Sequence, residues 1–485
     1  METLTQLISE LVDRKSAVFT EVSDRIWEFA ETRFEEAQSA ELLEQTLRSE
    51  GFEVERGVAG LDTGFIASFG SGAPVIAILG EYDALAGLSQ QAGSADYSPI
   101  TQGGSGHGCG HNLLGGGALT AAVAVKDYMR RHGIAGTVRY YGCPAEESGY
   151  GKTYMAREGL FRDVDAAFSW HPGPVNAVMH GSSNAVIHAT FHFRGRSSHA
   201  AASPHLGRSA LDAVELMNVG VNYMREHMIS EARVHYAITN SGGLAPNVVQ
   251  PEAEVTYLIR APRTSQVREL YARVQDIARG AALMTQTQMT SRLEGACANL
   301  IPNAALERVM HKYMTELGAP AATEEEVRFA KAIYDSTSAE DKASAAAQIG
   351  KQLAAELSER PIAEFIAPYV EKLSTMAAST DVADVSWNVP TAQCTTATWA
   401  FGTPFHTWQA VAQGQSSYAH KAMLLAGKVM ACAAIEALQS AELRAQAKTE
   451  LLERLDGESY DCLVPSDCRP PRLAELTETA ARLFA

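Results

Sequence analysis

Residues 103–112 read Gly-Gly-Ser-Gly-His-Gly-Cys-Gly-His-Asn, and Gly115-Gly116-Gly117 and an apolar helical pattern follow them. Cys109 and His111 are two residues apart, so their side chains would point the same way in an extended backbone. The surrounding glycines leave the backbone free to adopt tight or left-handed conformations. A loop of this kind can present two metal ligands. The alternative is a flexible connection with one ordinary buried thiol, which a Cys-x-His motif favours when it stands alone.

The bulk composition excludes several classes of protein. A chain of 485 residues is too long for one simple core, which predicts two or three domains. The 40 basic and 57 acidic residues give a net charge of -17, which argues against nucleic acid or an anionic membrane surface as a partner. The N-terminus has no signal-peptide pattern and no run of eighteen apolar residues occurs, so a cytoplasmic protein is expected.

Seven cysteines in such a chain do not indicate a disulfide framework. Cys143, Cys297, Cys394 and Cys432 lie among apolar or small residues, so we expect buried thiols there.

Strand and helix patterns alternate over the first part of the chain. Residues 1–50 predict two amphipathic helices, and a strand opens at residues 51–54. The all-apolar run at 75–79 predicts a strand buried on both faces. The patterns that follow predict, in order, a helix at 117–132, a strand at 137–141, a helix at 153–160 and a strand at 166–170. This order predicts an α/β domain with a mixed, mostly parallel sheet covered by helices.

The pattern changes near residue 184. Ile187, Ala189, Phe191 and Phe193 alternate with polar residues, as on one face of a half-exposed strand. The elements that follow are a helix at 209–227, strands at 234–239 and 254–259, a helix at 265–283 and a strand at 289–294. The order β-α-β-β-α-β predicts a ferredoxin-like α+β insert at residues 186–298, a lid domain. Residues 1–185 and 299–485 would then form the catalytic domain.

The last third of the chain is mostly helical. Residues 321–375 are rich in Ala, Glu and Lys at helical spacing, and a final helix is expected at 418–438. Residues 379–385 and 402–408 are irregular and polar, so they are interpreted as site loops.

Three further pieces can join the glycine-rich stretch in one site. Glu146 and Glu147 follow one predicted strand, His171 follows another, and His406 lies in a late Pro-Phe-His loop. Ligands of an open α/β sheet collect beyond the carboxyl ends of its strands, so these pieces can converge. Thiolate, imidazole and carboxylate are the ligands of zinc-like ions, and one of two adjacent glutamates can bind metal while the other serves as a base.

Each piece alone has a simpler explanation. A glutamate pair is usually a solvated acidic turn, and a lone histidine is usually structural; their combination with Cys109 and His111 reverses this weighting. Gly151-Lys152-Thr153 ends like a phosphate-binding loop, but that pattern requires glycine where this chain has Glu146. No G-x-S-x-G motif supports a serine hydrolase, and a nucleophilic Cys109 would compete with its use as a ligand.

Taken together, these motifs resemble the aminoacylase and carboxypeptidase G metallopeptidase family over nearly the whole chain. The cysteine-containing amidohydrolase branch, with the auxin-conjugate hydrolases, is the most similar. The motifs that carry the resemblance are Gly108-Cys109-Gly110-His111, Pro144-Ala145-Glu146-Glu147, His171 with Pro174, Gly195-Arg196-Ser197-Ser198-His199-Ala200, Asn247, Arg260, Ser379-Thr380-Asp381 and His406.

The resemblance implies two divalent metal ions, Mn²⁺ or Zn²⁺; a thiolate suits zinc, whereas the nearest relatives suggest manganese. Cys109 would bridge the ions, with His111 and His171 on one and Glu147 and His406 on the other. Many family members carry a histidine ligand where this chain has Glu81, which would lie near the metals without having to bind them.

The other roles come from the same resemblance. Glu146 would be the general base, and His199 would enter the site of a neighbouring subunit through a dimer interface formed by the lid domain. Asn247 and Arg260 would contact the carboxylate of the substrate. Asp83 and Asp381 would either orient the metal ligands or act only as turn and cap residues.

The implied function is a metal-dependent amidohydrolase that cleaves the amide bond of a small N-acyl or N-aroyl amino acid. Residues 80–85 and 381–387 resemble members that act on p-aminobenzoyl-glutamate, which is therefore the expected substrate. Two alternatives stay open: a dipeptidase or ring deaminase that uses the same metals, and a subunit active only in a hetero-oligomer. The long helical segment 321–375 leaves both a homodimer and an assembly with a related subunit possible.

Overall fold

Seven strands form the main sheet of the computed structural model, which describes residues 2–349 and 351–471. The strand order is β1-β2-β4-β3-β5-β13-β6. The four inner strands β4, β3, β5 and β13 are parallel, and antiparallel strands flank them on both sides. The bounds are β1 Glu53–Arg56, β2 Phe65–Ser71, β3 Val75–Glu81, β4 Gly136–Cys143, β5 Ala166–Gly173, β6 Ala177–Met179 and β13 Thr391–Ala397. The mixed, mostly parallel sheet is confirmed.

The central strand β3 shows why the sheet needs helices on both faces. Every residue of β3 is buried. Ile76 and Ile78 join one apolar core, and Ala77 and Leu79 join a second core on the opposite face. Successive side chains of a strand point to opposite faces, so an all-apolar strand must be covered on both.

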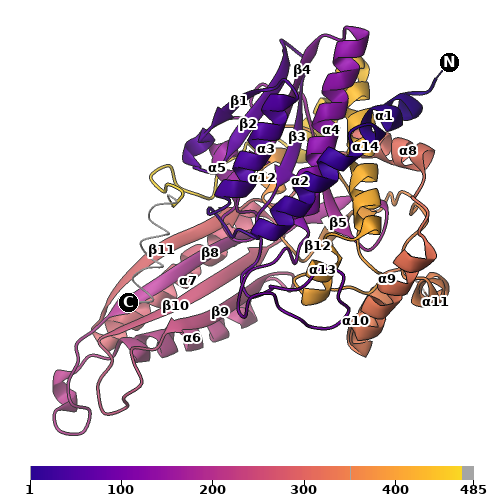
Figure 1. Cartoon of the computed structure of the whole chain (residues 1–485). Coiled ribbons are helices and arrows are strands. Elements are labelled where there is room, and N and C mark those ends of the chain that lie inside the picture. Colours follow the sequence, from indigo (N-terminus) through magenta and orange to yellow (C-terminus); the bar gives the residue numbers. More distant parts are fainter. Residues whose placement is uncertain (1, 350, 472–485) are drawn as a thin grey trace.

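Helices cover the two faces, as Figure 1 shows. The first core is shared by α1 Leu4–Asp13, α2 Ser16–Phe29, α3 Ala37–Ser49, α4 His111–His132, α8 Ala304–Leu317, α9 Glu324–Ser336, α14 Ser417–Gln439 and α15 Ala441–Leu455. On the other face lie α5 Gly151–Arg157 and α12 Val382–Ser386. The remaining helices are α10 Ala339–Ile349, α11 Lys351–Glu359, α13 Trp408–Gln413 and the short turn η1 Val58–Gly60.

Close packing of small residues defines the centre of this body. A Cβ atom on Gly117 of α4 would lie 2.6 Å from Nε1 of Trp170, so that glycine admits a strand side chain against the helix. The helix α14 is long and apolar enough to cross a membrane, but 78% of its apolar window is buried inside the fold, where it packs on α4. Its apolar surface therefore belongs to the core.

A second, antiparallel sheet projects from this body (Figure 1). Its order is β11-β8-β10-β9, with β8 Ala185–Arg194, β9 Arg233–Asn240, β10 Glu252–Ala261 and β11 Gln288–Cys297. The helices α6 Ala210–Met224 and α7 Thr264–Thr285 pack against it, and the short turns η2 Pro204–Leu206 and η3 Arg225–His227 flank α6. The predicted order of strands and helices is observed, and all four alternating apolar residues of β8 are buried. The edge strand β9 is exposed along almost its whole length.

One segment, residues 377–387, fastens both connections between the two sheets. The backbone N–H of Asn184, at the entry to β8, donates to the carbonyl of Ala378 at 3.0 Å. The backbone N–H of Ala298, just after β11, donates to Oδ2 of Asp384 at 3.1 Å. The strand β12 Ser374–Met376 precedes this segment and pairs with β7 Gly181–Ser183.

Several predicted boundaries were wrong. Residues 1–50 form three helices, because the chain turns at Arg14 and Lys15 and again at the left-handed Ala30. The helix α4 begins at His111 rather than at 117, since its glycines serve helix packing and not loop freedom. Residues 382–386 are helical rather than irregular. Beyond Glu359, the predicted helical segment 321–375 contains no further helix in the described residues.

Candidate metal centre

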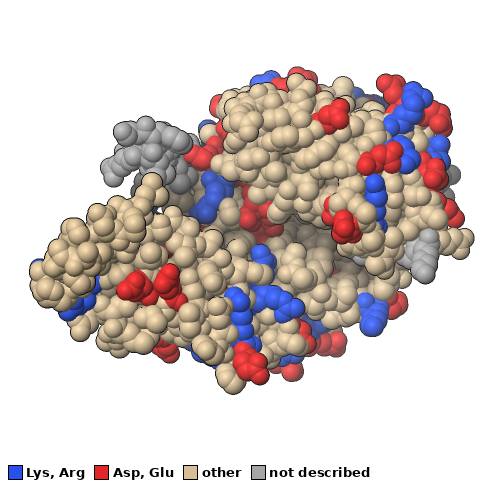
Figure 2. Space-filling model, turned by 90° about the horizontal axis from the view of Figure 1, so that it is seen from below, with Lys and Arg blue, Asp and Glu red and all other residues tan. Residues whose placement is uncertain are grey.

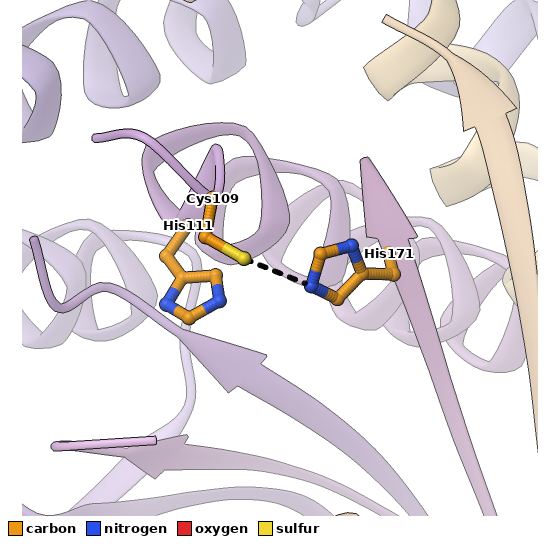
Figure 3. A group of neighbouring side chains, drawn as sticks. All are labelled: Cys109, His111 and His171. Atoms are coloured by element: carbon orange, nitrogen blue, oxygen red, sulfur yellow. Dashed lines mark hydrogen bonds between the residues drawn. The ribbon is translucent and has the colours of Figure 1, made fainter. Parts of the chain in front are cut away.

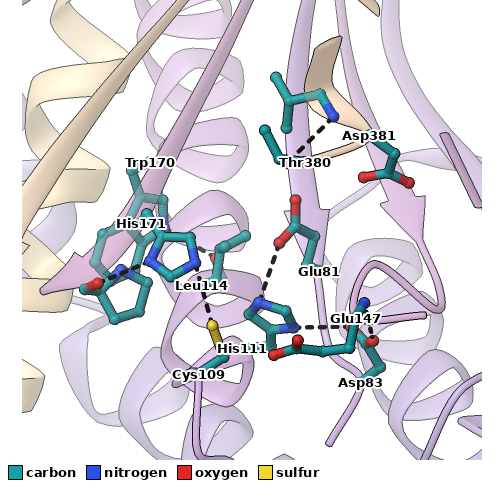
Figure 4. A network of polar contacts seen from close by, with 12 residues as sticks. Glu81, Asp83, Cys109, His111, Leu114, Glu147, Trp170, His171, Thr380 and Asp381 are labelled. Atoms are coloured by element: carbon teal, nitrogen blue, oxygen red, sulfur yellow. Dashed lines mark hydrogen bonds and ion pairs between the residues drawn. The ribbon is translucent and has the colours of Figure 1, made fainter. Parts of the chain in front are cut away.

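The metal-ligand candidates meet at the carboxyl ends of the parallel strands. Glu81 ends β3, Glu147 follows β4 and His171 lies near the end of β5, while His111 is the first residue of α4. Figure 4 shows these side chains pointing toward one another from different elements. This is the edge at which ligands of open α/β sheets bind, as the sequence indicated.

Gly110 determines how Cys109 and His111 are presented. Its φ of 73° is left-handed, and a Cβ atom there would lie 2.9 Å from Pro172. The expectation of an extended backbone between the two ligands was therefore wrong, because the chain turns at Gly110 directly into α4. The turn still brings Cys109, His111 and His171 into one group whose donor atoms lie within 4.8 Å of one another. Sγ of Cys109 lies 3.5 Å from Nε2 of His171 (Figure 3).

A second group shares the same cysteine. The donor atoms of Cys109, Glu147 and His406 also lie within 4.8 Å of one another, and Nε2 of His406 is 3.2 Å from Oε2 of Glu147. His406 has a left-handed φ of 58°, and its backbone N–H donates to the carbonyl of Gly108 at 3.0 Å. That contact ties the late loop to the glycine-rich stretch, so both groups converge on Cys109.

The donor atoms fit divalent ions. Nε2 of His111 and Oε1 of Glu147 are buried without a hydrogen-bond partner among the described residues, which is costly unless another group satisfies them. A tetrahedral ion with bonds of about 2.1 Å to nitrogen and oxygen holds those ligands about 3.4 Å apart. The distances in both groups match this spacing. The sulfur, nitrogen and oxygen donors suit zinc-like metals.

Neighbouring groups fix the orientation of the imidazoles. Nδ1 of His111 lies 2.8 Å from Oδ1 of Asp83, and Nδ1 of His171 lies 2.8 Å from the carbonyl of Pro172. A ring that donates through Nδ1 presents the lone pair of Nε2, the form that binds metal. Oδ2 of Asp83 also accepts from the backbone N–H of Glu147 at 2.9 Å, so Asp83 orients ligands of both groups.

The two adjacent glutamates have different environments. Burial, and then repulsion from Glu81, Glu147 and Asp381, raises the pKa of Glu146 well above its usual range. Burial would also raise the pKa of Glu147, but the hydrogen bond with His406 and the charge of His111 bring it below its usual value. Separation of two carboxyl pKa values in this way is the pattern of an acid–base residue beside an anionic ligand.

Asp381 reaches the ligands only through Lys152 and Glu81. Nζ of the fully buried Lys152 lies 2.5 Å from Oδ1 of Asp381 and 2.7 Å from Oε1 of Glu81. Burial raises the pKa of Asp381 to about 7, although Lys152 opposes that rise. In the sequence, Lys152 stands out only as part of the rejected phosphate-binding pattern, which gives no sign of this buried contact.

Glu36, which no sequence motif singled out, supports the turn that carries Glu146. Its Oε1 accepts from the backbone N–H groups of Phe34 and Ala145, both at 2.9 Å, and its Oε2 accepts from the hydroxyl of Thr63 at 2.9 Å. Burial, and then the charge of Asp83, raises its pKa to about 8. Only its place in an acidic stretch before α3 could have pointed to it.

Three predicted residues do not join the ligands within this chain. His199 is exposed at the projecting sheet, where Nδ1 accepts from the backbone N–H groups of Ala201 and Ala202. Asn247 is exposed beside it and is contacted through its backbone carbonyl. Arg260 of β10 donates to Oγ of Ser379 at 2.7 Å, which links the projecting sheet to the body. Figure 2 shows a hollow between the two parts, with acidic side chains at its floor.

Comparison with known proteins identifies the family. The model of peptidase family M20/M25/M40 matches residues 77–436. The chain is 48% identical over 480 residues to one of the subunits of p-aminobenzoyl-glutamate hydrolase of Escherichia coli K12, covering 98% of this chain and 100% of that protein. It is 30% identical over 340 residues to mouse Xaa-Arg dipeptidase, covering 67% and 74% of the two chains.

A solved structure agrees in fold. A dinuclear metal-binding M20 peptidase of Bacillus subtilis aligns with a TM-score of 0.54 at 17% identity, over 88% of this chain and 99% of that one. The chain therefore belongs to peptidase family M20/M25/M40 and is a hydrolase of that family.

Proposed function

We propose that this chain hydrolyses the amide bond of N-aroyl amino acids, with p-aminobenzoyl-glutamate as the substrate and p-aminobenzoate and glutamate as the products. Identity of 48% over nearly the whole length to a protein of the p-aminobenzoyl-glutamate hydrolase supports the substrate. The observation that carries the chemistry is Glu146, a carboxyl of raised pKa directly beside two groups of metal-ligand side chains.

Cys109, His111 and His171 would hold one Zn²⁺ or Mn²⁺ ion, and Cys109, Glu147 and His406 a second. When bound, such ions supply Lewis acidity to a carbonyl and lower the pKa of water. Glu146 then accepts a proton from the water that attacks the amide carbon, and donates a proton to the nitrogen that leaves. A carboxyl with a pKa raised toward neutrality can serve in both steps.

Phe405 supports an aromatic acyl group. Its side chain is 49% exposed, although it directly precedes His406 and its ring lies 5.6 Å from that of His171 and 5.0 Å from that of Trp399. A large exposed ring beside metal ligands offers a face or edge on which a benzoyl ring can pack. Phe405 would therefore bind the aroyl part of the substrate.

Residues 186–298 would form a ferredoxin-like lid that also makes the subunit interface. Its edge strand β9 exposes Tyr236 and Ile238, and the neighbouring α6 exposes Val219 and Tyr223. An exposed edge strand with apolar side chains is a surface that pairs with another chain. The exposed His199 would then reach the site of that chain, and Asn247 and Arg260 would bind the substrate carboxylate. The partner would be a second copy or a related subunit, in a cytoplasmic assembly.

A dipeptidase is the second candidate, because mouse Xaa-Arg dipeptidase is 30% identical to this chain. The purified chain, loaded with zinc or manganese, should be assayed against p-aminobenzoyl-glutamate, N-acetyl-glutamate and Xaa-Arg dipeptides. Preference for the aroyl substrate is expected. Preference for the dipeptides would favour the second candidate, and activity only after addition of a related subunit would identify a hetero-oligomer.

A further inference from the structure

Glu81, the last residue of β3, faces His111 in an arrangement that lacks a hydrogen bond. Its Oε2 lies 3.4 Å from Nε2 of His111, and both atoms are buried without a hydrogen-bond partner among the described residues (Figure 4). Asp83 occupies the Nδ1 side of the ring, so Nε2 presents its lone pair. Two buried acceptor atoms that face each other are unfavourable unless a cation lies between them.

The spacing is that of two ligands of one ion. Nitrogen and oxygen ligands of a tetrahedral ion lie about 3.4 Å apart when the bonds are about 2.1 Å long. The donor atoms of Glu81 and His111 also belong to a group, with Glu146, whose members all lie within 4.8 Å of one another. His111 is thus shared between this group and the group that contains Cys109 and His171.

The charges nearby leave one carboxylate unbalanced. Lys152 is the cation that contacts Glu81 and Asp381, through Nζ at 2.7 Å and 2.5 Å. One ammonium group thus faces two buried carboxylates, and an excess buried charge is costly unless it binds a cation. Because Lys152 holds Oε1 of Glu81, the other oxygen, Oε2, is directed at His111.

We propose that Glu81 is a fourth protein ligand of the ion held by Cys109, His111 and His171, and that Lys152 is the positioning residue that aims it. This rests on the two-ion site of the proposed function, and not on the identity of the substrate. One ion would then be enclosed by four protein ligands, as in structural sites, while the ion at Cys109, Glu147 and His406 keeps an open position, as in catalytic sites. The two ions would differ in affinity.

Metal content tests the assignment. Glu81→Gln keeps the shape of the side chain and leaves Lys152 paired with Asp381, so the chain is expected to fold. After dialysis against buffered free zinc, we expect two ions per chain in the wild type, and in E81Q an apparent Kd for one ion weakened at least about tenfold. Asp384→Asn, the same change at a buried carboxylate that binds Thr153 and Ala298, is the control and should retain both ions. Wild-type affinity for both ions in E81Q would overturn the assignment.

Thermal unfolding separates a ligand from a merely structural carboxylate. Without metal, E81Q should be at least as stable as the wild type, because it removes the unbalanced charge. With zinc, the midpoint of the wild type should rise more than that of E81Q, since binding stabilises the folded state. An equal loss of stability in E81Q with and without zinc would show that Glu81 only pairs with Lys152. Neither experiment uses a substrate, so each can fail while the proposed reaction stands.

Discussion

Replacement of Glu36 by Gln should make the chain more stable at neutral pH than the wild type. Glu36 is fully buried, and its pKa is raised from 4.5 to about 8. Between these values the folded state holds a proton that the unfolded state releases, so the stability of the wild type falls as pH rises. At about 1.4 kcal/mol for each pKa unit, the penalty reaches about 3 kcal/mol at pH 7 and about 5 kcal/mol above pH 8.

The glutamine can keep all three hydrogen bonds of Glu36. Its carbonyl oxygen accepts from Phe34 and Ala145, and its amide group donates to the hydroxyl of Thr63, which can reverse its role. The free energy of unfolding should therefore exceed that of the wild type by under about 1 kcal/mol at pH 5 and by about 3 kcal/mol at pH 7.

Chemical denaturation followed by fluorescence at pH 5, 6, 7 and 8, with a chelator in both samples, measures this difference. Glu41→Gln, at an exposed position of α3, is the matched control and should follow the wild type. A difference between E36Q and the wild type that does not change with pH would refute the assignment of a neutral Glu36, and a lower stability at every pH would show that the amide cannot replace the carboxyl group.

The remaining predictions concern the site. Glu146→Gln should lower kcat by about 10²–10⁴-fold, the usual contribution of a general base, while atomic spectroscopy finds its metal content unchanged; normal turnover would contradict the role of Glu146. Phe405→Ala should lower kcat/KM for p-aminobenzoyl-glutamate by about three- to tenfold more than for N-acetyl-glutamate, because only the first has a ring to pack on it; equal losses would remove Phe405 from acyl recognition. His199→Ala and Glu146→Gln should each be poorly active alone, whereas mixed and reassembled chains should regain activity, since a mixed dimer has one intact site; no recovery on mixing would place His199 outside the partner's site. Dialysis against a chelator should abolish hydrolysis and zinc or manganese should restore it; full activity in chelator would exclude a metal-dependent reaction.

Local patterns in the sequence were sufficient for the elements that build the site. The all-apolar run of β3 and the alternation in β8 each carry their burial pattern in a few consecutive residues. The strand ends then indicated where His171 and Glu147 would meet Cys109, because parallel strands bring their carboxyl ends to one edge. The edge strand β2 and the late strand β13 were not predicted, since short strands of mixed composition have no comparable local signal.

The groups that support the ligands could not be predicted in the same way. Lys152 contacts Glu81 and Asp381, and Glu36 contacts Ala145, across large distances in the sequence. Each of these polar residues would be equally well explained on a solvated surface, so only the folded chain shows what it binds. His199 lies outside the reach of both approaches for a different reason: the site that it is expected to complete belongs to another subunit.

The position of β13 bears on how the protein is made. This strand lies between β5 and β6 in the sheet, although it comes from residues 391–397. While the ribosome is still producing the preceding residues, one side of β5 has no neighbour, and an unpaired strand edge invites association with other nascent chains. His171 sits on that strand, so the metal centre cannot be completed until translation is almost finished.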